Sequence, residues 1–135
     1  MYIFRIISTL MLMLAVRPVF TNTVWQDERQ EFVADAGNMK VTTTLEFTSG
    51  KDVVVRFSSY MPPYPATYVN PDGTIDTNPG WSSQREKKGT YKYRRGKLTI
   101  TFEDDEPAME LKYTKDALIS LKEEYDGTRM VFIPR

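Results

Sequence analysis

Two groups of polar side chains lie close enough together in the sequence to be considered for acid–base catalysis or cation binding. The run Glu103–Glu106 offers paired carboxylates for acid–base catalysis or for holding a cation. Asn70, Asp72 and Asp76 offer oxygens around a glycine, as in a calcium loop, but the full spacing of an EF-hand loop is absent. A solvated hairpin tip and a polar turn explain the two groupings more simply. We therefore expect neither a catalytic site nor a metal site.

The composition excludes several further classes of site. The 135 residues contain no Cys and no His, which excludes disulfides, thiolate nucleophiles, Cys/His zinc sites and triads with an imidazole base. No G-x-S-x-G elbow and no phosphate-binding loop occurs. We expect a protein that is not an enzyme and has no cofactor. Eighteen basic and eighteen acidic residues cancel, so no overall charge attracts nucleic acid.

A segment rich in tyrosine and proline is the most unusual part of the chain. It lies within residues 59–89, and its aromatic residues are Tyr60, Tyr64, Tyr68 and Trp81. Structureless segments of this length are uncommon in compact domains and are often functional. One interpretation is a lid or a partner-binding surface made by residues 60–81. The alternative, slightly favoured because loop aromatics commonly pack on the body, is a strap over one end of the domain.

An alternation of apolar and polar residues with a period of two dominates the rest of the chain and predicts β-strands. The strands expected cover residues 24–32, 39–47, 53–57, 90–94, 97–102, 109–114, 118–124 and 130–133. The fold class expected is all-β, an antiparallel up-and-down meander of about eight strands that closes into a barrel, because closure removes exposed edges. An open β-sandwich is the alternative. Pairing of the first strand with the last distinguishes the two.

Five short motifs follow one another along these strands: Val24-Trp25, Leu45-Glu46-Phe47, Gly89-Thr90-Tyr91, Leu98–Phe102 and Gly127–Phe132. In this order they resemble the small lipocalin-like (calycin-type) β-barrel domains of secreted bacterial proteins. The resemblance implies a barrel over residues 23–135 with a small apolar or amphipathic ligand at its mouth. It also implies a basic side chain packed on Trp25, for which Arg129 and Arg135 are the candidates.

Whether such a ligand has room depends on the large rings that the apolar faces place inside. A barrel of about eight strands is just wide enough to be filled by side chains or to hold one small ligand, and a filled core is the commoner case. If the barrel has a cavity, the expected ligand-binding residues are Tyr93, Phe102 and Tyr113.

Residues 1–22 have the pattern of an export signal. Arg5 precedes an apolar stretch, residues 6–16, that is too short to span a bilayer, and the best cleavage region lies near residues 19–21. An uncleaved anchor is the alternative. Lipoprotein processing is excluded because there is no Cys. We expect a secreted or periplasmic protein that is a monomer and has no stable membrane span once the signal is removed.

These observations favour a non-enzymatic binding domain, with two candidate functions. The first is binding of a small apolar ligand at the barrel mouth. The alternative is a protein-interaction or inhibitor-like module that uses the loop 60–81 to bind an envelope or extracellular protein. A cavity beside Tyr93, Phe102 and Tyr113 favours the ligand, whereas a filled interior with exposed loop aromatics favours the protein partner.

Overall fold

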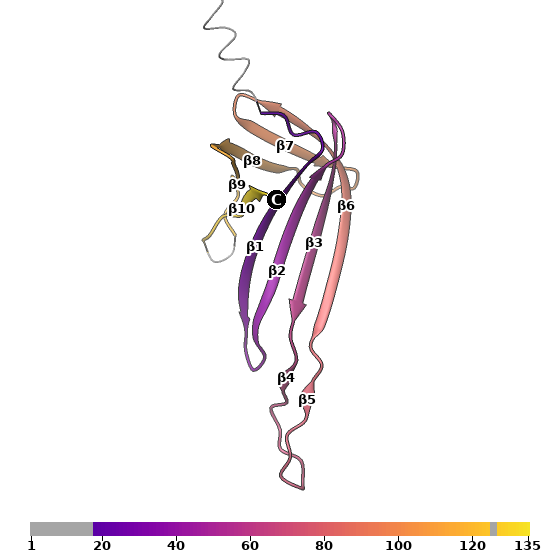
Figure 1. Cartoon of the computed structure of the whole chain (residues 1–135), viewed down its shortest axis with the longest axis vertical. Coiled ribbons are helices and arrows are strands. Elements are labelled where there is room, and N and C mark those ends of the chain that lie inside the picture. The colour runs from indigo at the N-terminus through magenta and orange to yellow at the C-terminus, as the bar shows by residue number, and fades with distance from the viewer. Residues whose placement is uncertain (1–17, 125–126) are drawn as a thin grey trace, which may run out of the picture.

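The computed structural model describes residues 18–124 and 127–135, and ten strands occur in that part of the chain (Figure 1). They are β1 (Thr23–Val33), β2 (Gly37–Phe47), β3 (Asp52–Met61), β4 (Tyr64–Pro65), β5 (Thr77–Asn78), β6 (Trp81–Arg94), β7 (Lys97–Phe102), β8 (Met109–Thr114), β9 (Ala117–Ser120) and β10 (Val131–Pro134). Residues 1–17 of the predicted signal lie outside the described residues.

Eight of these strands form one closed antiparallel barrel in the order β1-β10-β9-β8-β7-β6-β3-β2, and β4 and β5 form a separate two-stranded ladder. Because β1 pairs with β10 as well as with β2, the first strand meets the last. The predicted all-β, up-and-down barrel is confirmed, and the open sandwich is wrong.

The barrel has one tall side and one short side. Strands β1, β2, β3 and β6 have 10–14 residues, whereas β7–β10 have only 4–6. The four long strands therefore continue below the barrel as a sheet of their own (Figure 1). We call this part the long sheet; it comprises residues 28–33, 37–42, 58–61 and 81–86.

Strand β6 begins at Trp81, well before the strand predicted at residues 90–94. Most side chains of residues 81–88 are exposed, and only Lys87 is buried. A strand that is exposed on both faces has no reason to alternate between apolar and polar residues. The sequence pattern consequently missed it.

The hydrophobic core lies inside the closed part of the barrel. Its least exposed side chains, each at most 1% accessible, are Leu45, Phe47, Val53, Val55, Leu98, Ile100, Leu111, Leu118 and Phe132. They occupy the apolar positions of the predicted alternation and come from six of the eight barrel strands. Since protein interiors pack closely, these side chains occupy the barrel axis.

The seam between β1 and β10 is short, and a side chain extends it. Trp25 and Gln26 are the β1 residues in register with β10. Next to them, the buried Asp27 accepts a hydrogen bond from the Val131 amide at 2.9 Å through Oδ1, and from Arg29 Nε at 3.2 Å through Oδ2. A buried carboxylate thus takes the place of a backbone acceptor where the barrel closes.

Candidate functional site

The upper end of the barrel, as drawn in Figure 1, is closed by the chain's own N-terminal segment. Phe20 is buried there, with ring centroids 5.3–6.2 Å from those of Trp25, Phe47, Tyr91, Tyr93 and Tyr113. The amide and the hydroxyl of Thr23 both donate to the Phe20 carbonyl. This turn holds the Phe20 ring against the start of β1.

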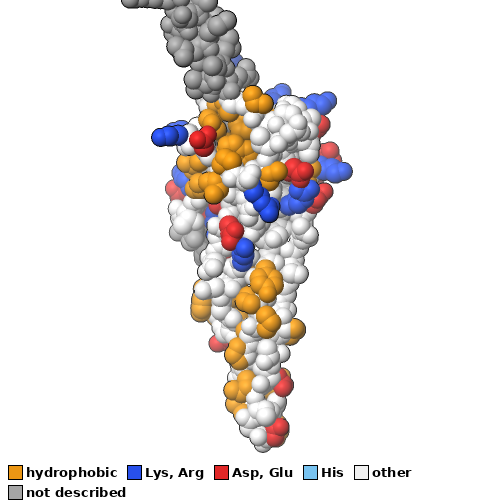
Figure 2. All heavy atoms as spheres, in the orientation of Figure 1, with side chains coloured by type: hydrophobic (Ala, Val, Ile, Leu, Met, Phe, Trp, Pro, Cys, Tyr) orange, Lys and Arg blue, Asp and Glu red, His pale blue; other side chains and the backbone are white. Residues whose placement is uncertain are grey.

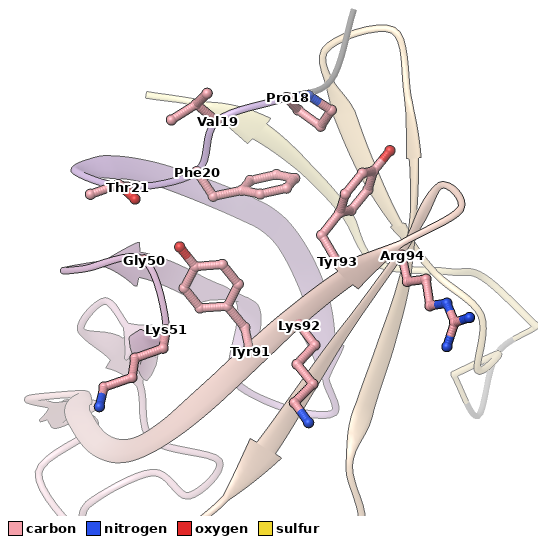
Figure 3. A pocket seen from close by; sticks show the side chains of 10 residues that line it. All are labelled: Pro18, Val19, Phe20, Thr21, Gly50, Lys51, Tyr91, Lys92, Tyr93 and Arg94. Carbon is pink, nitrogen blue, oxygen red and sulfur yellow. The ribbon is translucent and has the colours of Figure 1, made fainter. Parts of the chain in front are cut away.

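An open cleft of about 790 Å³ lies beside Phe20 (Figure 3). Its apolar lining comes from Pro18, Val19 and the rings of Phe20, Tyr91 and Tyr93. The side chains of Lys92 and Arg94 also border the cleft but point away from the rings (Figure 3). The cleft therefore offers an apolar group a partly aromatic surface that is open to solvent.

The structure brings together two of the three predicted ligand residues. The rings of Tyr93 and Tyr113 meet edge to face at 6.2 Å, and Tyr93 borders the cleft. Phe102 lies elsewhere, because Tyr93 is in register with Leu98, and four residues of strand separate Leu98 from Phe102 by about 13 Å. Phe102 packs instead beneath the Lys87 ammonium, 5.2 Å from its ring centroid.

The acidic tip between β7 and β8 is exposed, as predicted, and two of its carboxylates also pair with a buried lysine. The Lys87 side chain is only 8% exposed, and its Nζ lies 3.4 Å from Asp104 Oδ2 and in contact with the Glu106 carboxylate. The sequence did not predict this pairing, which arises because the inward face of β6 carries the Lys87 ammonium to the tip. The two carboxylates satisfy a charge that burial would otherwise penalise.

Removing these two carboxylates is expected to destabilise the protein through Lys87. The double substitution Asp104→Asn, Glu106→Gln should lower the free energy of unfolding by about 1–3 kcal/mol, a range discounted because both carboxylates are half-exposed. Adding Lys87→Met should restore most of the loss, since Met packs on Phe102 without a charge. Urea unfolding of the parent, the double variant, Lys87→Met alone and the triple variant gives the four free energies of this mutant cycle. If Lys87→Met has the same effect with and without the carboxylates, the ion pairs contribute nothing.

Residues 60–81 form a hairpin arm (Figure 1). Its base, Tyr60, Met61 and Trp81, lies in the long sheet, and the remainder projects beyond that sheet. The strap expected over one end of the domain is wrong: the ladder of β3 with β6 continues into β4 and β5 and carries the segment away from the barrel. The predicted partner-binding residues Tyr60, Tyr68 and Trp81 are exposed by 51, 59 and 41%. Tyr64 is half-buried, with its ring edge to face with Trp81 at 6.2 Å.

The base of the arm requires a glycine. Gly80 has a φ of +73°, and a Cβ at this position would lie 2.1 Å from the carbonyl oxygen of Met61 on β3. The neighbouring Met61 is itself buried and in register with Trp81. This close approach joins the arm to the end of the long sheet.

The tip of the arm is a turn held by hydrogen bonds between side chains. Asp72 Oδ1 accepts hydrogen bonds from the Thr74 amide at 3.0 Å and from the Thr74 hydroxyl at 2.6 Å. Asn70 Nδ2 donates to Thr74 and to Asp76. These contacts engage side-chain oxygens of Asp72 and Asp76, two of the three residues that the sequence places around Gly73.

The hydrogen bonds from Thr74 hold the pKa of Asp72 below its ordinary value of 3.8. Because the folded pKa is lowered, the stabilisation of the tip is complete above the ordinary pKa and is lost only as the pH falls through the folded one. We expect the Asp72 carboxyl, followed by NMR, to titrate below 3.8. In Thr74→Val, which lacks the hydroxyl donor, its midpoint should rise. Identical midpoints in the two proteins would contradict this assignment.

Comparisons with known proteins find no match. No protein-family model, no curated protein and no solved structure is significantly similar to this chain. The closed barrel is compatible with a lipocalin-like domain, but Arg129 does not cover Trp25: its guanidinium donates to the carbonyls of Ser120 and Leu121. Neither of the two cation–π contacts found among the described residues involves Trp25.

Residues 18–124 and 127–135 contain no helix that could cross a membrane. The same residues contain no group of three or more His, Cys, Asp or Glu side chains arranged to hold a metal ion.

Sequence reasoning missed two features of these sites. The expected signal, residues 1–22, includes Phe20, and no local pattern marks the contacts of this residue with rings far along the chain. Lys87 had a signal that was overlooked. It is two and four positions from Gly89 and Tyr91, so the period of a strand puts it on the same inward face.

Proposed function

We propose that this protein is a non-enzymatic, lipocalin-like interaction module that binds another protein through its hairpin arm. The observation that supports the proposal is the exposure of aromatic and aliphatic side chains along a projecting hairpin. Besides the three exposed aromatic residues, Val69 and Ile75 are exposed by 63 and 54%. Figure 2 shows hydrophobic side chains along the lower part of the molecule, whereas most charged side chains gather around the barrel.

The chemistry of the arm fits a protein surface better than a small molecule. Tyr and Trp are enriched in the centres of protein–protein interfaces, and contiguous exposed apolar area usually marks an interaction site. The barrel axis is filled by core side chains, whereas Tyr68, Val69 and Ile75 of the arm are each more than half exposed. Internal hydrogen bonds such as Ala66 N to Asp76 O at 2.8 Å hold the arm in shape, so binding costs little ordering entropy.

Site-specific photo-crosslinking in the native cell tests the proposal. The photoreactive amino acid p-benzoylphenylalanine replaces Tyr68 in one variant and Ile133 in a matched control, since these side chains are exposed by 59 and 57%. We expect one discrete crosslinked protein with the Tyr68 variant only. That protein is identified by mass spectrometry, purified and titrated against the unmodified chain.

In the purified pair, Tyr68→Ser combined with Trp81→Ser is expected to raise the Kd by about tenfold or more, as loss of interface aromatics does. Ile133→Ser should leave the Kd unchanged. Equal crosslinking at both positions, or a Kd that the arm substitutions do not alter, would overturn the proposed function.

A second candidate function is supported by the cleft beside Phe20. Its rings suit a small apolar or amphipathic ligand, and Tyr93 is the predicted ligand residue that it contains. Native mass spectrometry of the protein purified gently from its own envelope or medium tests this candidate. An extra mass that organic solvent removes supports a carrier. A clean polypeptide mass, reproduced after incubation with a lipid extract, argues against it. The same spectrum gives the N-terminal residue and so tests the proposed export signal.

A further inference from the structure

Strand β6 has an unpaired outer edge along the long sheet. It pairs with β3 from Trp81 to Thr90, but its pairing with β7 begins only at Gly89. In an antiparallel strand, successive residues direct their backbone groups to opposite sides. The Tyr91 amide donates to Lys51 beside β3, and the Lys88 carbonyl accepts on the other side. The even-numbered residues Ser82, Gln84 and Glu86 therefore direct their N–H and C=O groups outward, where no strand of the described residues pairs with them.

The upper end of this edge already holds an acidic segment of the same chain. The Glu103 amide donates to the Lys88 carbonyl at 3.3 Å, and Asp104 and Glu106 pair with Lys87. At its upper end, the β6 edge therefore already receives a backbone hydrogen bond from a neighbouring segment. Two carboxylates of the same segment pair with the inward-facing Lys87 of β6.

The next inward-facing cation below this contact lacks such a partner. Arg85 lies two residues before Lys87 on the same face, with its guanidinium 4.9 Å from the Phe57 ring centroid. None of the ion pairs between described residues includes Arg85. By contrast, the side chain of Glu86 lies on the opposite face of the sheet from Arg85, and its carboxylate is paired with Arg56 at 3.1 Å. The edge therefore combines free backbone groups with one unpaired positive charge.

We propose that the outer edge of β6, from Ser82 to Glu86, binds an extended acidic segment of the partner protein as an added strand. This inference rests on the proposed function and names the partner's recognition element. Strand addition satisfies the free backbone groups. A carboxylate of the added strand lies opposite Arg85, and an apolar residue four positions away lies on the same face opposite Trp81. The free part of β1 is the poorer edge, because its Arg29 is already paired with Asp27, its Glu28 is paired with Lys40, and Glu31 adds a negative charge.

The test uses a synthetic peptide with the proposed pattern. A nine-residue chain of alternating Thr and Val, with Phe and Glu four positions apart on one face, is titrated into the full protein labelled with ¹⁵N. We expect amide shifts at Ser82, Gln84 and Glu86 and none at Gln30 in β1. Replacing the peptide Glu with Lys should weaken binding about fivefold or more. Shifts at neither edge, or equal shifts at both, would overturn the inference.

A backbone substitution provides the matched control. Gln84→Pro removes the outward N–H while leaving the β3 ladder intact, because proline is tolerated where the amide faces away from the sheet; we expect about tenfold weaker peptide binding. Gln84→Thr changes only the side chain and should bind within about twofold of the parent. Equal binding by the two variants overturns the inference, as does a dimer that forms through this edge on concentration.

The outcomes also separate the two proposals. Tyr68→Ser should not change peptide binding, because Tyr68 lies out along the arm. A purified partner whose Kd is insensitive to Gln84→Pro would overturn the strand addition alone. Peptide binding to the edge, combined with a partner whose Kd is unchanged by Tyr68→Ser, would overturn the proposed function alone.

Discussion

Replacing Phe20 with Ala is expected to lower the free energy of unfolding by about 3–5 kcal/mol, the usual loss when a buried Phe is truncated. Phe20 is 4% exposed and touches five other rings. Its removal leaves a cavity that those rings cannot fill without leaving their own packing. Chemical denaturation monitored by tryptophan fluorescence measures the change, because Trp25 is one of the five neighbours.

Val19→Ala is the matched control, since Val19 precedes Phe20 but is 77% exposed; its effect should stay within about 0.5 kcal/mol. The intact mass of the purified protein, measured first, establishes that residue 20 is present. Similar losses for both variants would show that the Phe20 ring does not form part of the folded core.

Replacing Asp27 with Ala is expected to cost about 2–4 kcal/mol, because it removes a buried carboxylate and leaves both of its hydrogen-bond donors without an acceptor. The Val131 amide loses its acceptor, and Arg29, whose side chain is only 21% exposed, loses its counter-ion. The seam between β1 and β10 should weaken selectively. Hydrogen exchange should then accelerate at Val131 more than in the ladder of β2 with β3.

Asp27→Asn is the conservative variant: it keeps an oxygen for Val131 and should recover about half of the loss. Glu28→Ala controls for charge on the same strand, because Glu28 pairs with Lys40 on the exposed face and contributes about 0–1 kcal/mol. An Asp27→Ala variant no less stable than Glu28→Ala would mean that the barrel seam does not depend on this side chain.

The two candidate sites differ in how much of them could be read from the sequence. The aromatic residues of the arm stand out as a Tyr- and Pro-rich break in the alternation, and three of them are exposed as a binding surface requires. For Tyr93, Phe102 and Tyr113 the alternation predicts that the side chains point inward, but it does not predict how far along the barrel axis each one lies. Their separation depends on strand register, which places Leu98, not Phe102, beside Tyr93.

The all-β class can be predicted from the amino-acid sequence, as can the inward face of each core strand and the turn at Arg95-Gly96, where both residues adopt positive φ. Local rules suffice for these features, because a period of two and left-handed turn residues act over a few neighbours. The tertiary structure alone decided the rest: closure through Asp27, the place of Phe20, the pairing of Lys87 and the unpaired edge of β6. Each of these depends on which strands meet and in what register, and that is settled by the packing of residues far apart in the chain.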